Sequence, residues 1–165
     1  VDEHPDLPRD DFVKRLVGLP GDRIAVVDGS VYVNDERMPI EDTSAFHIDE
    51  TGRSLRVQTE QLGECRHAVL DDPAFRRGTE RREFVLPEGR YFMIGDNRDY
   101  SNASREWGTV RLQDLKGPAF VLYWSWDVNG NALQFFNPVN WWTADKRWSR
   151  IFQRVRCLAP GEDAV

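Results

Sequence analysis

Cysteine and histidine are scarce in this chain, and their spacing excludes several kinds of site. Of the 165 residues, two are cysteines, Cys65 and Cys157, and three are histidines. No CxxC pair occurs and the histidines lie far apart, so the sequence predicts no metal site and we expect no cofactor. The spacing neither requires nor excludes a disulfide between the two cysteines.

The chain also lacks an excess of positive charge and a long hydrophobic run. Its formal net charge is -6 at pH 7, and the lysines and arginines are scattered among acidic residues, so the basic surface of a nucleic-acid-binding protein is missing. The longest apolar stretch, AFVLYWSW at 119–126, is less than half of the roughly 20 residues that a membrane-spanning helix needs. We therefore expect no nucleic-acid partner and no transmembrane segment within these residues.

Repeats and low-complexity tracts are absent too, while 40% of the residues are hydrophobic, enough to build a core. The first residues, VDEHPDLPRDD, contain neither Met nor a signal-peptide pattern. We therefore expect either the middle of a longer polypeptide or a processed start.

The patterns that are present favour β structure. Residues 12–17 alternate as a strand does, and LPGD at 19–22 is typical of a turn. Two β-rich runs, 23–27 and 31–33, flank Asp28-Gly29, which is a strong hairpin signal. This part of the chain is expected to be a β meander.

Composition changes after this meander. Residues 35–83 are polar and rich in charge, with short strand candidates at 55–58 and 66–70, which predicts an inserted, weakly structured lobe. Helical periodicity occurs only in ADKRWSRIFQR at 144–154. We therefore expect a mainly β fold with a short C-terminal helix. Its parts are a discontinuous β domain over 1–34 and 84–156, the smaller lobe over 35–83, and a tail over 157–165.

Lys14 is the first unusual residue, since it shares one strand face with Phe12 and Leu16. An ordinary lysine has a pKa of about 10.4 and is a poor base near neutral pH. Apolar neighbours that exclude water lower this pKa, because desolvation disfavours the ammonium form. The alternative interpretation is a lysine at a sheet edge whose amine reaches the solvent.

The second unusual stretch is a polar loop, GDNRDYSNASREWG at 95–108, directly after the apolar run YFMI. Together, FVKRLVGLPGDRI (12–24) and YFMIGDNRDYSNASREWGTV (91–110) resemble two signature boxes of the bacterial type I signal peptidases, the Ser/Lys leader peptidases. Between them, LGECRHAVL and FVLPEGRYFM are also similar to that family. The resemblance covers nearly the whole chain.

This resemblance implies an antiparallel β catalytic domain with a variable β insertion, held at the bacterial cytoplasmic membrane by N-terminal segments and facing its outer side. It implies that the enzyme removes signal peptides from exported preproteins by a Ser/Lys dyad. Lys14 would be the general base, and Ser101 would orient its amine by hydrogen bonding. The other implied residues support the structure (Arg15, Asp96, Asn97 and Arg105) or bind the substrate (Asp11, Phe12 and Val13).

Some of these roles have simpler alternatives. Asp96 pairs with Arg15 in the implied site, whereas Asn97 is equally well interpreted as a turn residue. Arg105 is interpreted as structural. In the family, an aspartate usually follows the serine by two residues; here that position is Ala103, so Arg105 is expected to turn to another acid such as Asp99.

The nucleophile that the resemblance implies precedes the lysine box by several dozen residues. None of the serines in the chain lies before Lys14. We therefore name no nucleophile and expect these 165 residues alone not to cleave a substrate.

Aromatic residues crowd the last quarter of the chain. NPVNWW at 137–142 is a candidate for a patch at the membrane surface, since indoles favour the membrane–water boundary. Trp124 and Trp126 are equally well explained as core residues.

Two rival functions remain: a self-cleaving, repressor-type Ser/Lys peptidase, and an inactive homologue that binds extended peptides.

Overall fold

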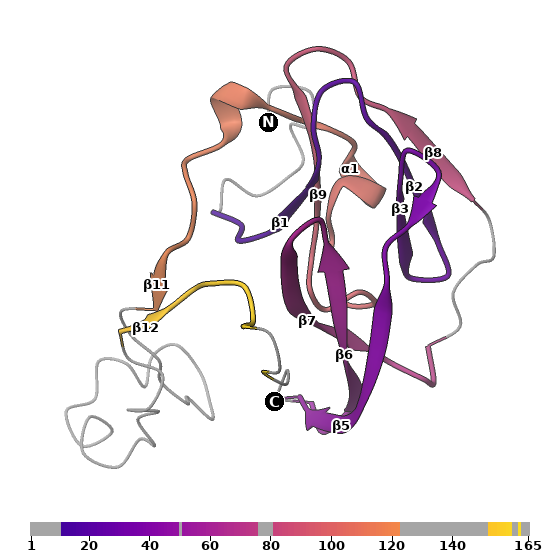
Figure 1. Ribbon diagram of the computed structural model, residues 1–165, viewed down its shortest axis with the longest axis vertical. Coiled ribbons are helices and arrows are strands. Elements are labelled where there is room, and N and C mark those ends of the chain that lie inside the picture. The colour runs from indigo at the N-terminus through magenta and orange to yellow at the C-terminus, as the bar shows by residue number, and fades with distance from the viewer. Residues whose placement is uncertain (1–10, 50, 76–80, 123–151, 160–161, 163–165) are drawn as a thin grey trace. The chain divides into compact units, whose positions relative to one another are not determined.

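The computed structural model describes residues 11–49, 51–75, 81–122, 152–159 and 162 (Figure 1). The chain folds into two compact units, one of residues 1–117 with 157–165 and the other of residues 118–156. In the second unit the described strands are β11 (Val121–Leu122) and β12 (Gln153–Arg154), which pair antiparallel. The domain boundaries at 35 and 83 stay a prediction.

The first unit contains a four-stranded antiparallel sheet of order β4-β3-β2-β8. Its strands are β2 (Arg23–Val27), β3 (Ser30–Val33), β4 (Glu36–Arg37) and β8 (Arg82–Val85). The expected hairpin is confirmed, since Val27 pairs with Ser30 across the turn. Asp28 and Gly29 both have positive φ, 46° and 77°, as a two-residue hairpin turn of this hand requires.

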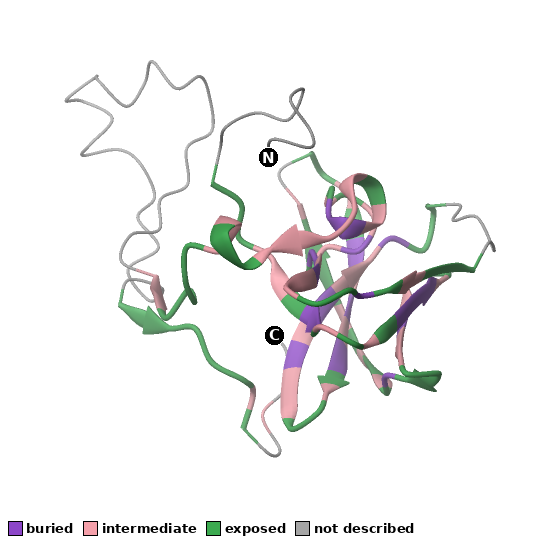
Figure 2. Cartoon of the chain, turned by 90° about the horizontal axis from the view of Figure 1, so that it is seen from above, coloured by how far each residue is buried: buried purple, intermediate pink, exposed green. Residues whose placement is uncertain are grey.

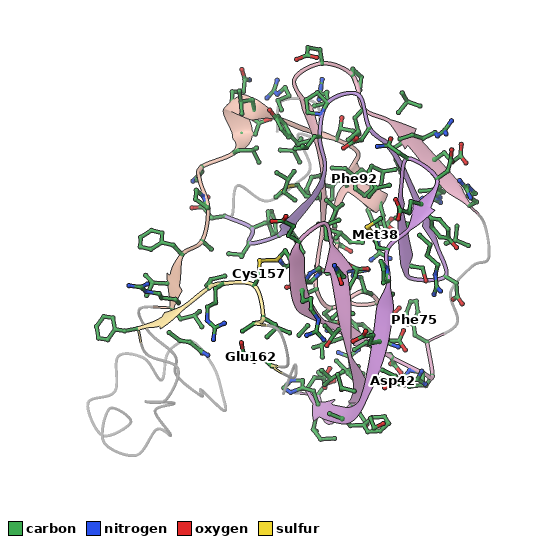
Figure 3. The ribbon with its side chains drawn as sticks, viewed as in Figure 1. Met38, Asp42, Phe75, Phe92, Cys157 and Glu162 are labelled. Carbon is green, nitrogen blue, oxygen red and sulfur yellow. A yellow bond between two sulfur atoms is a disulfide. The ribbon has the colours of Figure 1, made fainter. Side chains whose placement is uncertain are left out.

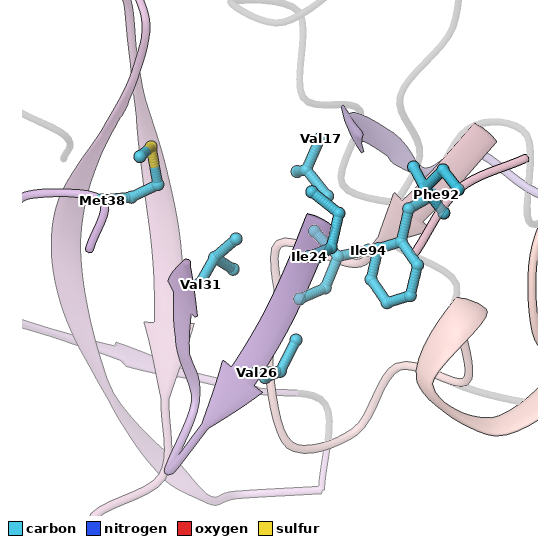
Figure 4. Packing of buried hydrophobic residues seen from close by; sticks show 8 residues of the cluster. Val17, Ile24, Val26, Val31, Met38, Phe92 and Ile94 are labelled. Atoms are coloured by element: carbon cyan, nitrogen blue, oxygen red, sulfur yellow. The ribbon is translucent and has the colours of Figure 1, made fainter. Parts of the chain in front are cut away.

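A hydrophobic cluster joins residues of this sheet to Val17, Phe92 and Ile94, which lie outside it (Figure 4). Ile24, Val31, Phe92 and Ile94 are completely buried there, as inward-facing strand residues are. The buried strand faces appear in purple in Figure 2. The full cluster is Val17, Ile24, Val26, Val31, Met38, Leu86, Phe92 and Ile94.

A three-stranded sheet of order β1-β9-β10 carries the two unusual stretches of the sequence. It consists of β1 (Arg15–Gly18), β9 (Arg90–Ile94) and β10 (Val110–Arg111). Between β9 and β10 lies the helix α1 (Ser104–Trp107), and after β10 follows the 3-10 helix η1 (Leu112–Asp114). The first residue of β1, Arg15, pairs with the last residue of β9, Ile94.

The third sheet corrects one expectation. The segment 35–83 was predicted to be weakly structured, with short strands at 55–58 and 66–70. The two short strands are confirmed as parts of β6 (Ser54–Leu62) and β7 (Cys65–Asp71), but the segment is not weakly structured, because these strands and β5 (Ile40–Ile48) form an antiparallel sheet. The full length of β6 and β7 was missed because they bury the charged or polar residues Thr59, Glu60 and His67, which interrupts the apolar alternation that predicts a strand.

Cys65 and Cys157, which the sequence left open, form a disulfide across 92 positions of the chain (Figure 3). Next to it, the Leu158 amide donates a hydrogen bond to the Arg66 carbonyl at 2.8 Å. The C-terminal residues are thus tied covalently and by a backbone hydrogen bond to the start of β7.

Two further expectations concern the C-terminal part. The helix expected at 144–154 lies mainly outside the described residues, and the described end of that range is the strand β12, not a helix. The aromatic residues of 137–142, and Trp124 and Trp126, also lie outside the described residues. Across the part of the chain that is described, no helix combines the length and apolar character needed to cross a membrane.

Candidate active site

Antiparallel pairing of β1 with β9 brings the two unusual stretches together. Because Arg15 lies opposite Ile94, the residue before β1 and the loop after β9 meet at one end of the sheet (Figure 1). There the Lys14 amine donates a hydrogen bond to the Ser101 hydroxyl, across 87 positions of the sequence. The site therefore consists of a lysine directly before β1 and a serine on the loop that follows β9.

The surroundings of Lys14 disfavour its charge. Burial lowers the pKa of the Lys14 amine below its ordinary value, and the Arg105 guanidinium lowers it further. The Asp96 carboxylate acts in the opposite direction. Lys14 therefore loses its proton at a lower pH than an exposed lysine, which a general base near neutral pH requires.

Phe12 and Leu16 contribute less to this burial than the sequence predicts. The strand begins at Arg15, so Phe12 lies before it, and the two side chains are 54% and 39% exposed. The Lys14 nitrogen is 5.9 Å from the centre of the Phe12 ring, a distance at which the ring face attracts the cation. Both side chains are therefore partly exposed and exclude less water from Lys14 than expected.

Gly95 makes room for the serine. A Cβ atom at Gly95 would lie 1.9 Å from the Ser101 Oγ and 2.2 Å from the Ser101 Cβ. The Ser101 side chain thus occupies the space that any larger residue at 95 would fill, and it is held between Gly95 and the Lys14 amine. This glycine was not singled out in the sequence, although it opens the GDNRDYS loop.

Arg15 and Asp96 form the ion pair that the family resemblance implies. Arg15 Nε and Nη2 donate to Asp96 Oδ1 and Oδ2 at 2.8 and 2.9 Å. Two parallel bonds of this kind fix direction as well as distance. The pair joins β1 to the first residues of the loop, directly beside Lys14 and Ser101.

The remaining loop residues have structural contacts. Asn97 Oδ1 accepts a long hydrogen bond, 3.4 Å, from the Tyr100 amide, as its interpretation as a turn residue predicts. Arg105 Nη2 donates to the carbonyls of Arg98 and Ser101, so it supports the loop from α1. Ala103, at the position of the missing acid, is fully buried.

The three residues implied in substrate binding lie before β1. Val13 is 82% exposed, and Phe12 is exposed as well. Asp11 accepts a hydrogen bond from the exposed amine of Lys116. No substrate contact follows from these positions alone, so this role stays a prediction.

Sequence reasoning missed Ser104, which anchors α1. Its hydroxyl accepts a hydrogen bond from the Met93 amide on β9 at 2.9 Å, and the residue is completely buried. A helix of four residues is too short for a periodic pattern to reveal. Arg98 and its buried partner Glu60 were missed as well, since their positions in the sequence are far apart.

Known proteins resemble this chain in sequence. The family Signal peptidase, peptidase S26, matches residues 1–124. A signal peptidase I of Rickettsia canadensis is 31% identical over 157 residues, which cover 87% of this chain and 59% of that protein. A signal peptidase I of Pseudomonas aeruginosa is 33% identical over 139 residues, which cover 76% of this chain and 48% of that protein.

The chain spans about half the length of the curated relatives that it matches. The mainly antiparallel β fold agrees with the fold that the sequence resemblance implies. The family match extends over both the Lys14 strand and the loop of Ser101, the two stretches that the fold brings into contact. The chain is a member of the bacterial type I signal peptidase family.

Proposed function

We propose that this chain is the catalytic part of an endopeptidase that removes signal peptides from exported proteins, with Lys14 as the general base. The observation that carries the proposal is the hydrogen bond from the Lys14 amine to Ser101, in surroundings that lower the lysine pKa. A base must be neutral to accept a proton, and an ordinary lysine is almost entirely charged at neutral pH.

The proposed reaction has two steps with one base. Neutral Lys14 takes the proton from a serine hydroxyl while that oxygen attacks the carbonyl carbon of the scissile peptide bond. The resulting ammonium returns the proton to the leaving amine, which yields an acyl-enzyme and the freed N-terminus of the mature protein. Lys14 then takes a proton from water, whose oxygen attacks the ester carbon; the ammonium returns this proton to the leaving serine oxygen, which releases the signal peptide and regenerates the serine and the neutral lysine.

Ser101 is proposed to position the base and not to attack. Its hydroxyl accepts the hydrogen bond from Lys14 and lies against Gly95. This contact fixes the orientation of the amine toward the serine hydroxyl from which it takes a proton. By the family resemblance, the attacking serine precedes the lysine strand in the full-length protein. The Arg15–Asp96 pair is proposed to hold strand and loop in register.

The substrate is proposed to bind as an extended peptide beside residues 11–13. Backbone hydrogen bonds to a strand-like segment recognise a peptide largely independently of its side chains, which suits signal peptides of varied sequence. The exposed Phe12 and Val13 would contact the substrate side chains.

The outer side of the bacterial cytoplasmic membrane is the proposed location. The disulfide between Cys65 and Cys157 supports it, because disulfides persist in oxidising compartments and are rare in the cytosol. A membrane-surface role for 137–142 stays a prediction.

The test uses the full-length enzyme with a preprotein in detergent. We expect Lys14→Met to lower kcat/KM by roughly 10²–10⁴-fold, the range of general-base catalysis, and Ser101→Ala to lower it less. Arg37→Met is the matched control, because Arg37 Nη2 also donates to a serine hydroxyl, that of Ser30 at 3.1 Å, on another sheet. Unchanged activity in Lys14→Met would refute the proposal.

A second arm tests the position of the nucleophile. The 165 residues and a longer chain that restores the preceding segment are incubated with the same preprotein. Cleavage by the longer chain alone agrees with a nucleophile before Lys14. Cleavage by the short chain that disappears in Ser101→Ala would mean that Ser101 attacks and that its positioning role is wrong.

A further inference from the structure

The loop from Asp96 to Ser101 has two neighbours. On one side its two end residues contact Arg15 and Lys14, the residues at the start of β1. On the other side, every residue between these ends contacts the sheet β5-β6-β7 or the loop that follows it. The geometry of the site therefore depends on a sheet that contributes no residue to the proposed chemistry.

Backbone hydrogen bonds make the first connection. The Leu70 amide of β7 donates to the Asp96 carbonyl at 2.8 Å, and the Arg98 amide donates to the Leu70 carbonyl at 3.0 Å. Leu70 and Asn97 form a parallel bridge. The start of the loop thus continues the sheet beyond β7, and Asp96 is held by β7 through its backbone and by Arg15 through its side chain.

A buried ion pair makes the second connection. Arg98 Nη1 donates to Glu60 Oε1 at 2.9 Å, and Arg98 Nη2 donates to Glu60 Oε2. Glu60 and Arg98 are 0% and 2% exposed. Arg98 Nη1 also donates to the Gly29 carbonyl at 3.1 Å, so this guanidinium joins the loop, β6 and the β2–β3 turn.

The charge on Glu60 is stabilised within this cluster. Burial opposes ionisation of the carboxyl, but the interactions with the nearby His67 ring and with the Arg98 guanidinium together outweigh it and hold the Glu60 pKa below its usual range. His67 lies directly opposite Glu60 on β7, with its Nε2 3.2 Å from Glu60 Oε2. Removing either charge of the pair would leave the other buried without its partner, which is strongly unfavourable.

Tyr100 makes the third connection, next to Ser101. Its hydroxyl donates a hydrogen bond to Asp72, and the Arg53 guanidinium lies 3.7 Å from the centre of its ring. The Asp72 amide in turn donates to Asp99 Oδ2 at 2.7 Å. Phe75, labelled in Figure 3, packs edge-on against the ring with the centroids 5.6 Å apart.

We propose that the sheet β5-β6-β7 positions the Lys14–Ser101 pair, and that Glu60 and Arg98 are the positioning residues, because their ion pair holds the loop against the sheet. This inference rests on the proposed function, since it assigns the sheet a part in the same site. Of the groups around Lys14, Ser101 and Asp96 belong to the anchored loop, and Arg105 donates to the carbonyl of Arg98. Phe12, whose ring lies 5.9 Å from the Lys14 nitrogen, is a neighbour outside this loop.

The first experiment measures the pKa of Lys14 directly. The chain contains three lysines, Lys14, Lys116 and Lys146, so a titration of lysine-labelled protein followed by NMR gives few signals to assign. In Glu60→Gln we expect the loop to loosen and water to reach the amine. The Lys14 pKa then rises toward that of an exposed lysine.

The second experiment measures cleavage by the full-length enzyme. Below the pKa of the base, the neutral fraction of Lys14 falls as that pKa rises, so the acidic limb of kcat/KM moves to higher pH. We expect kcat/KM at pH 7 to fall about tenfold or more in Glu60→Gln. Arg98→Lys keeps the charge but loses the two parallel bonds to Glu60. Its kcat/KM at pH 7 is expected to lie between that of Glu60→Gln and that of the wild type.

Two controls separate positioning from stability. Glu41→Gln makes the same substitution in the same sheet, where the exposed carboxylate of Glu41 pairs with Arg66 at 3.2 Å. Val31→Ala removes volume from the buried cluster on β3 and lowers the melting temperature. Both are expected to leave the Lys14 pKa and the pH limb unchanged at temperatures where the protein is folded.

The outcomes are distinct. If Glu60→Gln and Arg98→Lys only lower the melting temperature, as Val31→Ala does, the pair is merely structural and the inference is wrong. If Glu60→Gln does not fold, Arg98→Lys and Tyr100→Phe, which removes the bond to Asp72, decide by the same readouts. If the Lys14 pKa rises as expected but the wild-type enzyme cleaves no preprotein, the positioning stands and the proposed function fails.

Discussion

Substitution of Gly95 by alanine tests the site with the smallest change in chemistry. The added methyl group would lie 1.9 Å from Ser101 Oγ, whereas ordinary contact begins at 3.4 Å. The serine oxygen, or the backbone beneath it, must therefore move by about 1.5 Å, the difference between these two distances. A displacement of this size breaks the hydrogen bond from Lys14, because such bonds extend over a range of only about 0.5 Å.

We expect Gly95→Ala to lower kcat/KM about 10²-fold, the loss that a displacement of about 1 Å can cause. Overpacking is expected to lower the free energy of unfolding by about 1–3 kcal/mol. The assay follows preprotein cleavage by the full-length enzyme, together with a urea unfolding curve.

Gly18→Ala is the matched control on β1. A Cβ there would lie 2.7 Å from the side chains of Ile24 and Leu86, so it crowds the buried cluster, by about half as much as at Gly95, without touching Ser101. Gly18→Ala is expected to lower the free energy of unfolding but to leave most of kcat/KM intact. If Gly95→Ala folds and cleaves as fast as Gly18→Ala, the Lys14–Ser101 contact is not needed and our reasoning about the site is refuted.

Three other predictions concern charge and the disulfide. Asp96→Asn is expected to move the acidic limb of kcat/KM to lower pH and Arg105→Gln to higher pH, since the two groups shift the Lys14 pKa in opposite directions; limbs that move together would contradict this. Lys14→Met is expected to raise the free energy of unfolding at pH 7, because a lowered folded-state pKa makes wild-type stability rise with pH up to about 10.4. Urea unfolding of both proteins from pH 6 to 11 checks that the difference in the free energy of unfolding between Lys14→Met and the wild type disappears above about pH 10.4. Reduction of the Cys65–Cys157 disulfide, which closes 92 positions, is expected to cost about 4–5 kcal/mol, and an unchanged melting temperature in reductant would exclude this contribution.

The sequence by itself determined the local features of this protein. The Asp28-Gly29 hairpin follows from the positive φ angles that these two residue types tolerate. The Lys14 strand and the loop of Ser101 were identified by their motifs, since each lies within a few consecutive residues. The pairing of Arg15 with Asp96 was also expected, because the two motifs together resemble one family.

Only the tertiary structure decided what surrounds these motifs. Glu60 and Arg98 lie 38 positions apart, and a buried charge pair leaves no periodic signal because each partner by itself resembles an exposed residue. The same buried charge hid the full length of β6 and β7, where the apolar alternation of Leu55 and Val57 gives way to Thr59 and Glu60. The need for glycine at 95 likewise arises from Ser101, a residue that approaches it only after the loop has folded back.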